Sequence, residues 1–172
     1  MPYNRISADC HLDMIWLPPD LFVSQARQDL KDRMPYVTDS PDGPQWVAKN
    51  GAKFGLAGGV GASGTKYEPG KQLRVDKMAA AGLYDDGKKG IRRPGDPHLR
   101  VKDMDRDGVD AEVIYGILAA AAKLNDTEAS NEVLRIYNTW LNENRAIFEL
   151  RPAILMNFWQ NYMRPRRASA AG

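Results

Sequence analysis

The segment 96–141 constrains the fold more than any other part of the chain. An apolar run, Ala111–Ile117, lies between two stretches with helical signals. The first begins at Asp96-Pro97, which suits an N-cap followed by the first helical position, and ends at Gly108. The second, Asn125–Leu141, repeats apolar residues at helical spacing. A strand of near-continuous apolar character between two helices is typical of a parallel sheet, so we predict an α/β protein.

Further elements are predicted before and after this segment. Arg5–Leu12 is expected to form the first strand. Asn125, followed three residues later by Glu128, resembles a capping box at the start of the last helix. Ile154–Trp159 fits either a strand or a helix, and its periodicity does not decide between them.

The segment 18–95 is rich in glycine and proline, which predicts a long loop insertion after the first strand. Two local elements are expected inside it. Asn50-Gly51, between two short β-like runs, suits the type I′ turn of a hairpin. Lys71–Leu83 is expected to form a short helix that ends near Gly82.

Length and composition exclude several classes of protein. A chain of 172 residues, 43% of them hydrophobic, suits one globular domain, and its single cysteine excludes a disulfide-stapled scaffold. The longest uncharged apolar run, Val113–Ala122, is about half of the roughly 20 residues that a spanning helix needs. The first residues do not resemble a secretory signal, and a net charge of +2 does not indicate nucleic-acid binding. We therefore expect a cytoplasmic protein with no membrane or nucleic-acid partner.

Three further sequence features are not expected to form functional sites. Gly59–Gly64 spells G-x-G-x-x-G, but a hairpin arm precedes it and Pro69 follows it, so a flexible loop is expected rather than a dinucleotide or phosphate site. Asp103–Gly108 imitates half of a calcium-binding loop, but the twelfth position is Ile114 rather than Glu. His98, in the first turn of a helix, is expected at the surface.

Asp9-Cys10-His11 is the stronger candidate for chemistry. Residues i and i+2 of a strand share one face, so Asp9 and His11 are expected to point the same way and Cys10 the opposite way. A carboxylate and an imidazole on one face suit either a metal ion or a simple hydrogen bond at the end of a strand. Cys10 is expected to be a small core residue rather than a nucleophile.

These residues, read together with others along the chain, resemble a known family. Five segments carry the resemblance, namely Ile6–His11, Leu17–Phe22, Arg33–Pro35, Arg100–Tyr115 and Arg135–Leu141. They are similar to the amino-terminal part of the amidohydrolase-related family, the branch with aminocarboxymuconate-semialdehyde decarboxylase-like enzymes. The resemblance implies a TIM-like (β/α)₈ barrel that acts on a small-molecule substrate. It implies hydrolysis of C–N or C–O bonds, or decarboxylation, with a divalent metal, zinc foremost, and with Asp9 and His11 as metal ligands.

The resemblance covers roughly residues 5–142. We expect residues 1–142 to form the first two to three β/α units and residues 143–172 to form a divergent basic tail. From Arg145 onward there are five Arg, one Glu and no Lys. A (β/α)₈ barrel takes about 250 residues. We therefore expect a truncated and incomplete enzyme, with later metal ligands and catalytic residues unknown. Two alternatives stay open: a non-catalytic interaction protein that pairs its open sheet edge with another chain, and a homo-oligomer that assembles a site between copies.

Overall fold

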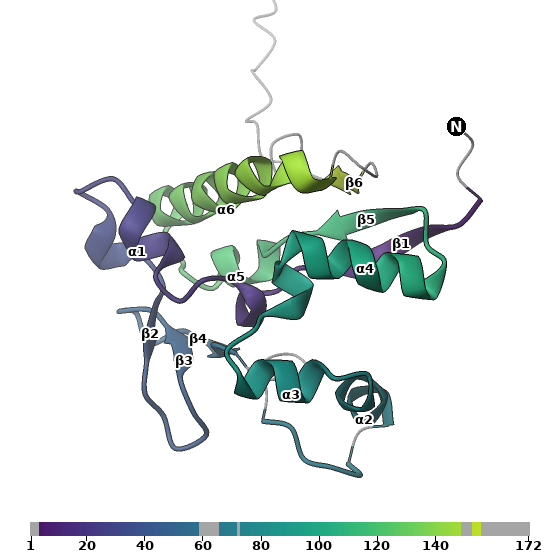
Figure 1. Cartoon of the computed structure of the whole chain (residues 1–172). Coiled ribbons are helices and arrows are strands. Elements are labelled where there is room, and N and C mark those ends of the chain that lie inside the picture. The colour runs from purple at the N-terminus through teal and green to yellow at the C-terminus, as the bar shows by residue number, and fades with distance from the viewer. Residues whose placement is uncertain (1–3, 59–65, 72, 149–152, 156–172) are drawn as a thin grey trace, which may run out of the picture.

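The protein is a mixed α/β structure with two separate sheets. A computed structural model describes residues 4–58, 66–71, 73–148 and 153–155 (Figure 1). A parallel sheet has the order β1 (Ile6–His11), β5 (Ala111–Tyr115), β6 (Ala153–Leu155). A second, antiparallel sheet has the order β2 (Tyr36–Thr38), β3 (Gln45–Val47), β4 (Lys53–Leu56). The predicted α/β class and parallel sheet are confirmed, and the described strands do not close into a barrel.

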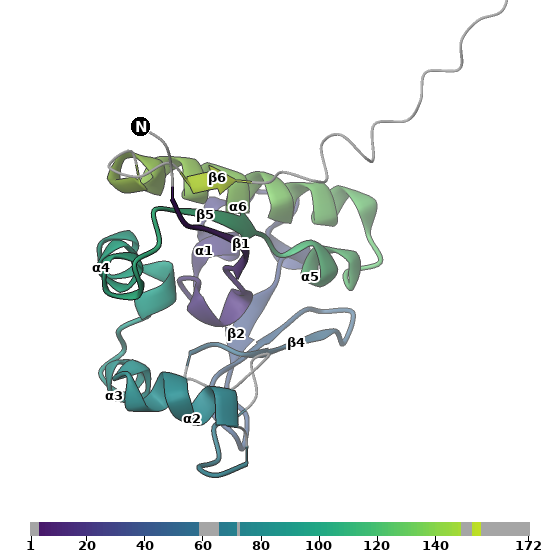
Figure 2. The ribbon, with the colours of Figure 1, turned by 90° about the vertical axis from the view of Figure 1, so that its right-hand side faces the viewer.

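The helices lie around these sheets as Figures 1 and 2 show. The long α6 runs along the parallel sheet, α4 lies beside the same sheet, and α2 and α3 lie away from it. No helix in the described ranges combines the length and apolarity needed to cross a bilayer. The α-helices are α1 (Leu21–Gln25), α2 (Leu73–Ala80), α3 (Leu83–Lys88), α4 (Pro97–Asp107), α5 (Leu118–Ala122) and α6 (Thr127–Phe148), and the 3₁₀ turns are Met14–Trp16, Lys31–Arg33 and Arg93–Gly95.

The helix α4 forms as the sequence predicts. The Asp96 side chain accepts a hydrogen bond from the backbone N–H of Leu99 at 3.0 Å, and Pro97 occupies the first helical position. Gly108 ends the helix with a φ of 65°, a left-handed conformation that glycine adopts without a Cβ penalty. Both ends of α4 are therefore set by local sequence.

The start of α6 differs from the predicted capping box by one residue. Asn125 is left-handed, with a φ of 50°, and Asp126 accepts the capping hydrogen bond from the backbone N–H of Ala129 at 3.1 Å. Asp126 also pairs with Arg33 at 2.6 Å, so a distant residue favours it as the cap. Further along, α6 continues without a break from residue 142 to residue 148, across the predicted start of the divergent tail.

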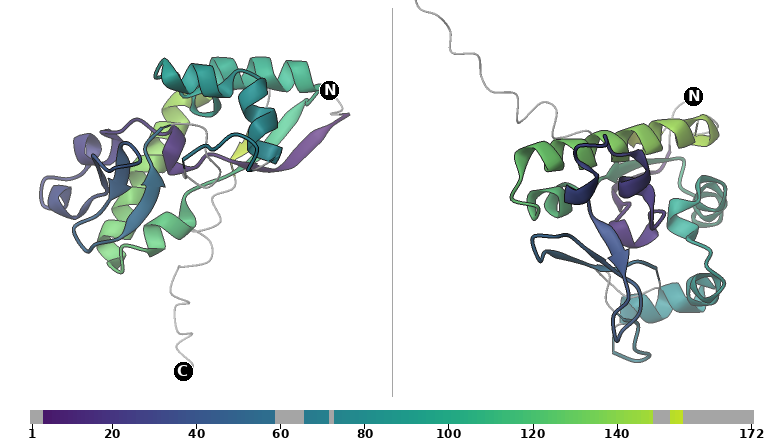
Figure 3. Two further views of the ribbon diagram at one scale, coloured as in Figure 1. Left: turned by 90° about the horizontal axis from the view of Figure 1, so that it is seen from below. Right: turned by 90° about the vertical axis from the view of Figure 1, so that its left-hand side faces the viewer.

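The insertion at 18–95 contains more regular structure than the hairpin and the short helix that the sequence predicts. It holds α1, the antiparallel sheet, α2 and α3. Phe22 and Trp46 are fully buried, and their rings meet edge to face with centroids 5.6 Å apart. Phe22 and Trp46 belong to the same apolar core as Ile114 of β5 and Val133 of α6, so the insertion and the parallel sheet share one core. Figure 3 shows the β2–β3–β4 sheet on the side of the molecule away from α4.

The predicted hairpin is present, but its turn is not type I′. The N–H of Gly51 donates to the carbonyl of Ala48 at 2.9 Å, and Gly51 has a φ of 85°. Asn50 does not have the positive φ that a type I′ turn requires. The loop is instead the three-residue kind, in which a left-handed glycine follows the turn, and the Asn50 side chain is free to donate to the carbonyl of Leu124 at 2.8 Å.

Strand β1 carries a bulge that decides the orientation of its side chains. Ser7 lies opposite Glu112 and Cys10 lies opposite Ile114, so three steps along β1 match two steps along β5. Glu112 and Ile114 face the helices, since Glu112 binds Arg100 of α4. We call this the helix-covered face of the sheet. The extra residue brings both Ser7 and Cys10 to the helix-covered face and leaves Asp9 and His11 on the opposite, open face.

Candidate functional site

Asp9 and His11 share the open face at the carboxyl end of β1, as the sequence predicts. The Nε2 atom of His11 lies 3.0 Å from Oδ1 of Asp9. The side chain of His11 is 53% exposed and that of Asp9 is 88% exposed, so neither is sequestered in the core. The carboxyl ends of parallel strands are where α/β proteins place their ligands, and this pair stands at that edge.

The spacing of the two donor atoms fits a divalent metal ion. Zinc binds nitrogen and carboxylate oxygen at about 2.0–2.2 Å, so two ligands of one ion lie about 2.9–3.4 Å apart for angles between 90° and tetrahedral. The observed 3.0 Å between His11 Nε2 and Asp9 Oδ1 falls inside this range. The same distance also suits a direct hydrogen bond between the two side chains. Within the described residues, no group of three or more His, Cys, Asp and Glu side chains is placed to hold a metal.

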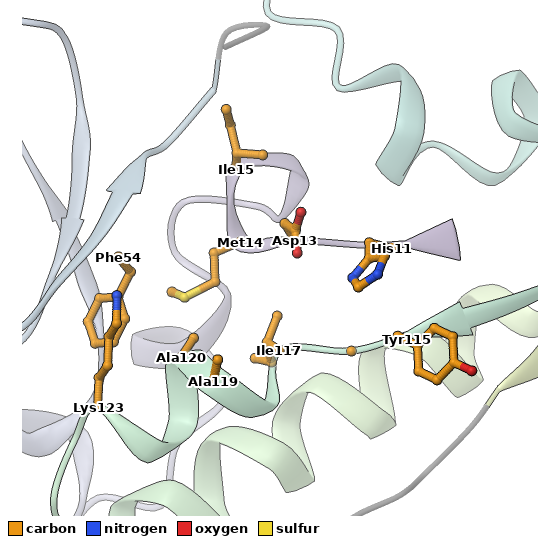
Figure 4. Close-up of a pocket in the computed structure, with 11 residues that line it drawn as sticks. His11, Asp13, Met14, Ile15, Phe54, Tyr115, Ile117, Ala119, Ala120 and Lys123 are labelled. Carbon is orange, nitrogen blue, oxygen red and sulfur yellow. The ribbon is translucent and has the colours of Figure 1, made fainter. Parts of the chain in front are cut away.

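A cleft of about 450 Å³ opens beside His11, beyond the ends of β1 and β5. This volume lies in the range of small-molecule sites, about 300–1,000 Å³. Figure 4 shows His11 and Tyr115 on one side of the cleft and Phe54 and Lys123 on the other. The remaining lining is mostly apolar and comes from Met14, Ile15, Ile117, Ala119 and Ala120, together with Asp13 and Gly116.

The antiparallel sheet and the parallel sheet both contribute to this cleft. Phe54 comes from β4, inside the insertion, whereas Tyr115 ends β5 and lies opposite His11 in the sheet register. The rings of His11 and Tyr115 have centroids 5.7 Å apart and are tilted by 35°. Lys123 donates to the carbonyl of Lys53 at 3.3 Å, which connects α5 to the insertion.

Sequence reasoning missed these cleft residues, although one of them had a signal. Tyr115 lies within the predicted apolar strand Ala111–Ile117 and ends the observed β5, and a polar tip at the carboxyl end of a parallel strand is a recognisable position for function. Phe54 and Lys123 had no comparable signal in the sequence. Their positions at the cleft depend on how the insertion folds back over the carboxyl ends of β1 and β5.

A cluster of polar side chains lies on the helix-covered face of β1 and β5, opposite the face that carries Asp9 and His11. The Arg100 Nε donates to Oε2 of Glu112 at 2.6 Å, and the Cys10 thiol donates to Oε1 of Glu112 at 3.4 Å. Ser7 Oγ lies 3.0 Å from the Cys10 sulfur. Burial, together with the Glu112 carboxylate, raises the pKa of the Cys10 thiol. The Cys10 thiol is therefore held in its protonated form, which is the weaker nucleophile.

The other sequence motifs do not join this site. His98 is exposed on α4, as predicted. Asp103 lies inside α4, where it pairs with Arg93 at 3.0 Å and Arg106 at 3.2 Å, so the stretch 103–108 is the end of a helix and not a calcium loop. The G-x-G-x-x-G stretch at 59–64 lies outside the described residues.

Comparison of the chain with models of protein families and with curated proteins gives no match. The geometry of the cleft and of the Asp9–His11 pair therefore carries the functional argument, together with the resemblance noted in the sequence.

Proposed function

We propose that this chain supplies the first β/α units of a TIM-like barrel enzyme of the amidohydrolase-related type, a metal-dependent hydrolase or decarboxylase of a small molecule. The observation that carries the proposal is the Asp9–His11 pair. Its donor atoms lie 3.0 Å apart on the open face of β1, and His11 of the pair lines a small-molecule-sized cleft. The parallel pairing of β1 with β5 and the position of α4 between them in sequence agree with the first unit of such a barrel.

In this proposal each group has a distinct task. Asp9 Oδ1 and His11 Nε2 hold a divalent ion, with zinc foremost. Such an ion, when bound, polarises a carbonyl or carboxylate or lowers the pKa of bound water. Tyr115 packs against the imidazole of His11 and limits its rotation. The apolar lining of the cleft excludes water from a substrate, and Lys123 at its far side favours a substrate with negative charge.

Two ligands are fewer than a catalytic zinc site uses, which is three from protein plus an open position. The described residues also supply three parallel strands, compared with the eight of a complete barrel. The proposal therefore requires further donors and strands from beyond the described residues or from another chain.

A second candidate is a non-catalytic interaction protein, and one observation favours it. β1 is an edge strand of the described parallel sheet, and Ile6 on it is 51% exposed. An open edge with an exposed apolar residue is suited to pairing with another chain. Under this candidate the Asp9–His11 contact is a hydrogen bond without a metal.

Metal titration separates the two candidates. Isothermal titration with Zn²⁺ is carried out on the wild-type protein, on His11→Ala and on His98→Ala. His98 is the chain's other histidine and is exposed on α4, so it is a matched control. We expect saturable binding that weakens more than about 10-fold in His11→Ala, since even an outer-shell partner is worth 10–100-fold in affinity. Binding that is absent, or equal in both variants, contradicts the proposal.

The reaction class is tested on the zinc-loaded protein. A panel of small amides, esters and aliphatic or aromatic carboxylic acids is assayed for hydrolysis and for release of CO₂. Turnover that disappears in His11→Ala and persists in His98→Ala supports the enzyme. Zinc binding without turnover of any panel member points instead to a metal-binding protein.

A further inference from the structure

The cleft beside His11 differs in charge between its two ends. At one end His11 is accompanied by Asp13, which follows it by two residues, and by its hydrogen-bond partner Asp9. Figure 4 shows Lys123 at the other end, on the same side as Phe54. Among the described residues that line the cleft, Lys123 carries the only permanent positive charge. The cleft therefore has carboxylates toward one end and an ammonium group at the other.

The ammonium group of Lys123 is held in place and still has donors to offer. Its Nζ donates to the carbonyl of Lys53 at 3.3 Å, and this carbonyl belongs to the peptide bond between Lys53 and Phe54. An ammonium group has three N–H donors, of which this bond uses one. Lys123 forms no ion pair with a carboxylate in the part of the chain that the structure describes. Two donors and an uncompensated positive charge are therefore available to a ligand.

The space between the two ends is apolar and suits an aromatic ligand. Met14 and Ile117 line it and are each only 4% exposed, and Ala119 and Ala120 add small apolar groups. Phe54, which is partly buried against the core, contributes an aromatic ring to the lining. Aromatic rings pack favourably against other rings and against methionine sulfur. A flat aromatic body therefore matches this lining better than a polar one.

We propose that the cleft binds an aromatic monocarboxylate, with the carboxylate on Lys123 and the uncharged end of the ligand toward His11. One ammonium group balances one negative charge, so a carboxylate matches the site better than a doubly charged phosphate. Asp9 and Asp13 repel an anion from the His11 end, which fixes the direction of the ligand in the metal-free protein. Lys123 thus selects the ligand and orients it.

The part of this ligand in a reaction rests on the proposed function. The metal held by Asp9 and His11 then lies at the uncharged end of the ligand, so the carboxylate on Lys123 is not the group that reacts. The reacting bond belongs to a substituent at the opposite end of the aromatic body, such as an amide or an ester. Of the reactions proposed for this chain, hydrolysis of a C–N or C–O bond is therefore favoured over decarboxylation.

The binding step is tested on the full chain without a metal. Dissociation constants of para-acetamidobenzoate and of its neutral counterpart para-acetamidobenzamide are measured by nuclear magnetic resonance titration in the presence of EDTA. The proteins are the wild type, Lys123→Met, Lys123→Arg and Lys49→Met. Lys49 is another exposed lysine of the insertion, paired with Asp32 at 3.0 Å and absent from the cleft lining, so it is a matched control.

We expect the wild type to bind the carboxylate at least about 3-fold more tightly than the neutral amide, as for the stronger exposed ion pairs. Lys123→Met is expected to lose this preference, whereas Lys123→Arg and Lys49→Met keep it. The comparison of the two probes on the wild type requires no variant to fold. A smaller preference, a preference that survives in Lys123→Met, or an equal loss in Lys49→Met overturns the subsite and leaves the metal-ligand pair untouched.

The direction of the ligand is tested by adding Mn²⁺, a paramagnetic divalent ion, to the same mixtures. We expect the acetyl methyl protons of para-acetamidobenzoate to relax faster than the ring protons beside the carboxylate, and this effect to disappear in His11→Ala. The opposite order overturns the proposed direction. Absence of any Mn²⁺ effect in the wild type, with the carboxylate preference intact, overturns the metal-ligand role of Asp9 and His11 and leaves Lys123 as a carboxylate subsite.

Discussion

Removing Arg100 is predicted to destabilise the protein more than the loss of any exposed ion pair. Arg100 and Glu112 are only 10% and 13% exposed, and their Nε–Oε2 distance is 2.6 Å. Arg100 also donates to the carbonyl of Pro94 at 3.0 Å. In Arg100→Met the Glu112 carboxylate keeps only the weak thiol donor of Cys10 and stays largely out of water.

The size of the expected loss of stability follows from the burial of the Arg100–Glu112 pair. Removing one partner of a buried ion pair costs about 3–5 kcal/mol, because the other charge is left uncompensated. We expect a loss of about 3 kcal/mol for Arg100→Met, at the lower end, because the Glu112 side chain retains some contact with solvent. For a chain of this size about 1 kcal/mol corresponds to roughly 2–4 °C in Tm, so the expected decrease is roughly 6–12 °C.

The assay is urea unfolding followed by circular dichroism, on the wild type and three variants. Arg100→Met/Glu112→Leu replaces both charges by apolar groups of similar size, which is often neutral, so it is expected to recover most of the loss. Lys49→Ala removes an exposed pair with Asp32 and is expected to leave the midpoint unchanged. The reasoning is refuted if Arg100→Met stays within about 1 kcal/mol of the wild type, or if the double variant is no more stable than Arg100→Met.

Three further predictions follow from single contacts. Tyr137→Phe removes the buried hydrogen bond to the carbonyl of Leu12 at 3.1 Å and is expected to cost about 1 kcal/mol in urea unfolding. Arg135 holds the pKa of Glu132 at about 2, below the ordinary 4.5, so the stability that Glu132 contributes is present above pH 4.5 and decreases as the pH falls toward 2. Urea midpoints measured from pH 2 to pH 6 are therefore expected to vary less in Glu132→Gln. Gly116→Ala is expected to lower the free energy of unfolding by about 1–3 kcal/mol, and the urea midpoint with it, because the added Cβ meets the Tyr137 ring at 2.8 Å. A midpoint equal to that of the wild type contradicts this clash.

The sequence predicted the elements that local chemistry determines. The Asp96 cap, the Gly108 stop and the apolar periodicity of α6 all act within a few residues, and α4 and α6 form where they indicate. Features that depend on distant partners were not predictable in this way. Asp126 replaces Asn125 as the cap of α6 in a position where it also pairs with Arg33, which is remote in sequence. The described parts of the insertion share one apolar core with the rest of the chain, through buried residues such as Phe22 and Trp46.

Asp9, Cys10 and His11 show the same difference between features that the local sequence predicts and features that depend on distant contacts. Alternation along a strand predicts that Asp9 and His11 share a face, but it does not predict which face. The bulge decides this, since without the extra residue Asp9 would lie on the side of Ser7, toward α4. In the bulged segment the Cys10 thiol donates a hydrogen bond to Glu112, and Glu112 also accepts one from Arg100. A buried ion pair on the opposite face of the sheet therefore supports the segment that carries the proposed metal ligands. Under the proposed function, Arg100→Met is expected to weaken zinc binding as well as the fold.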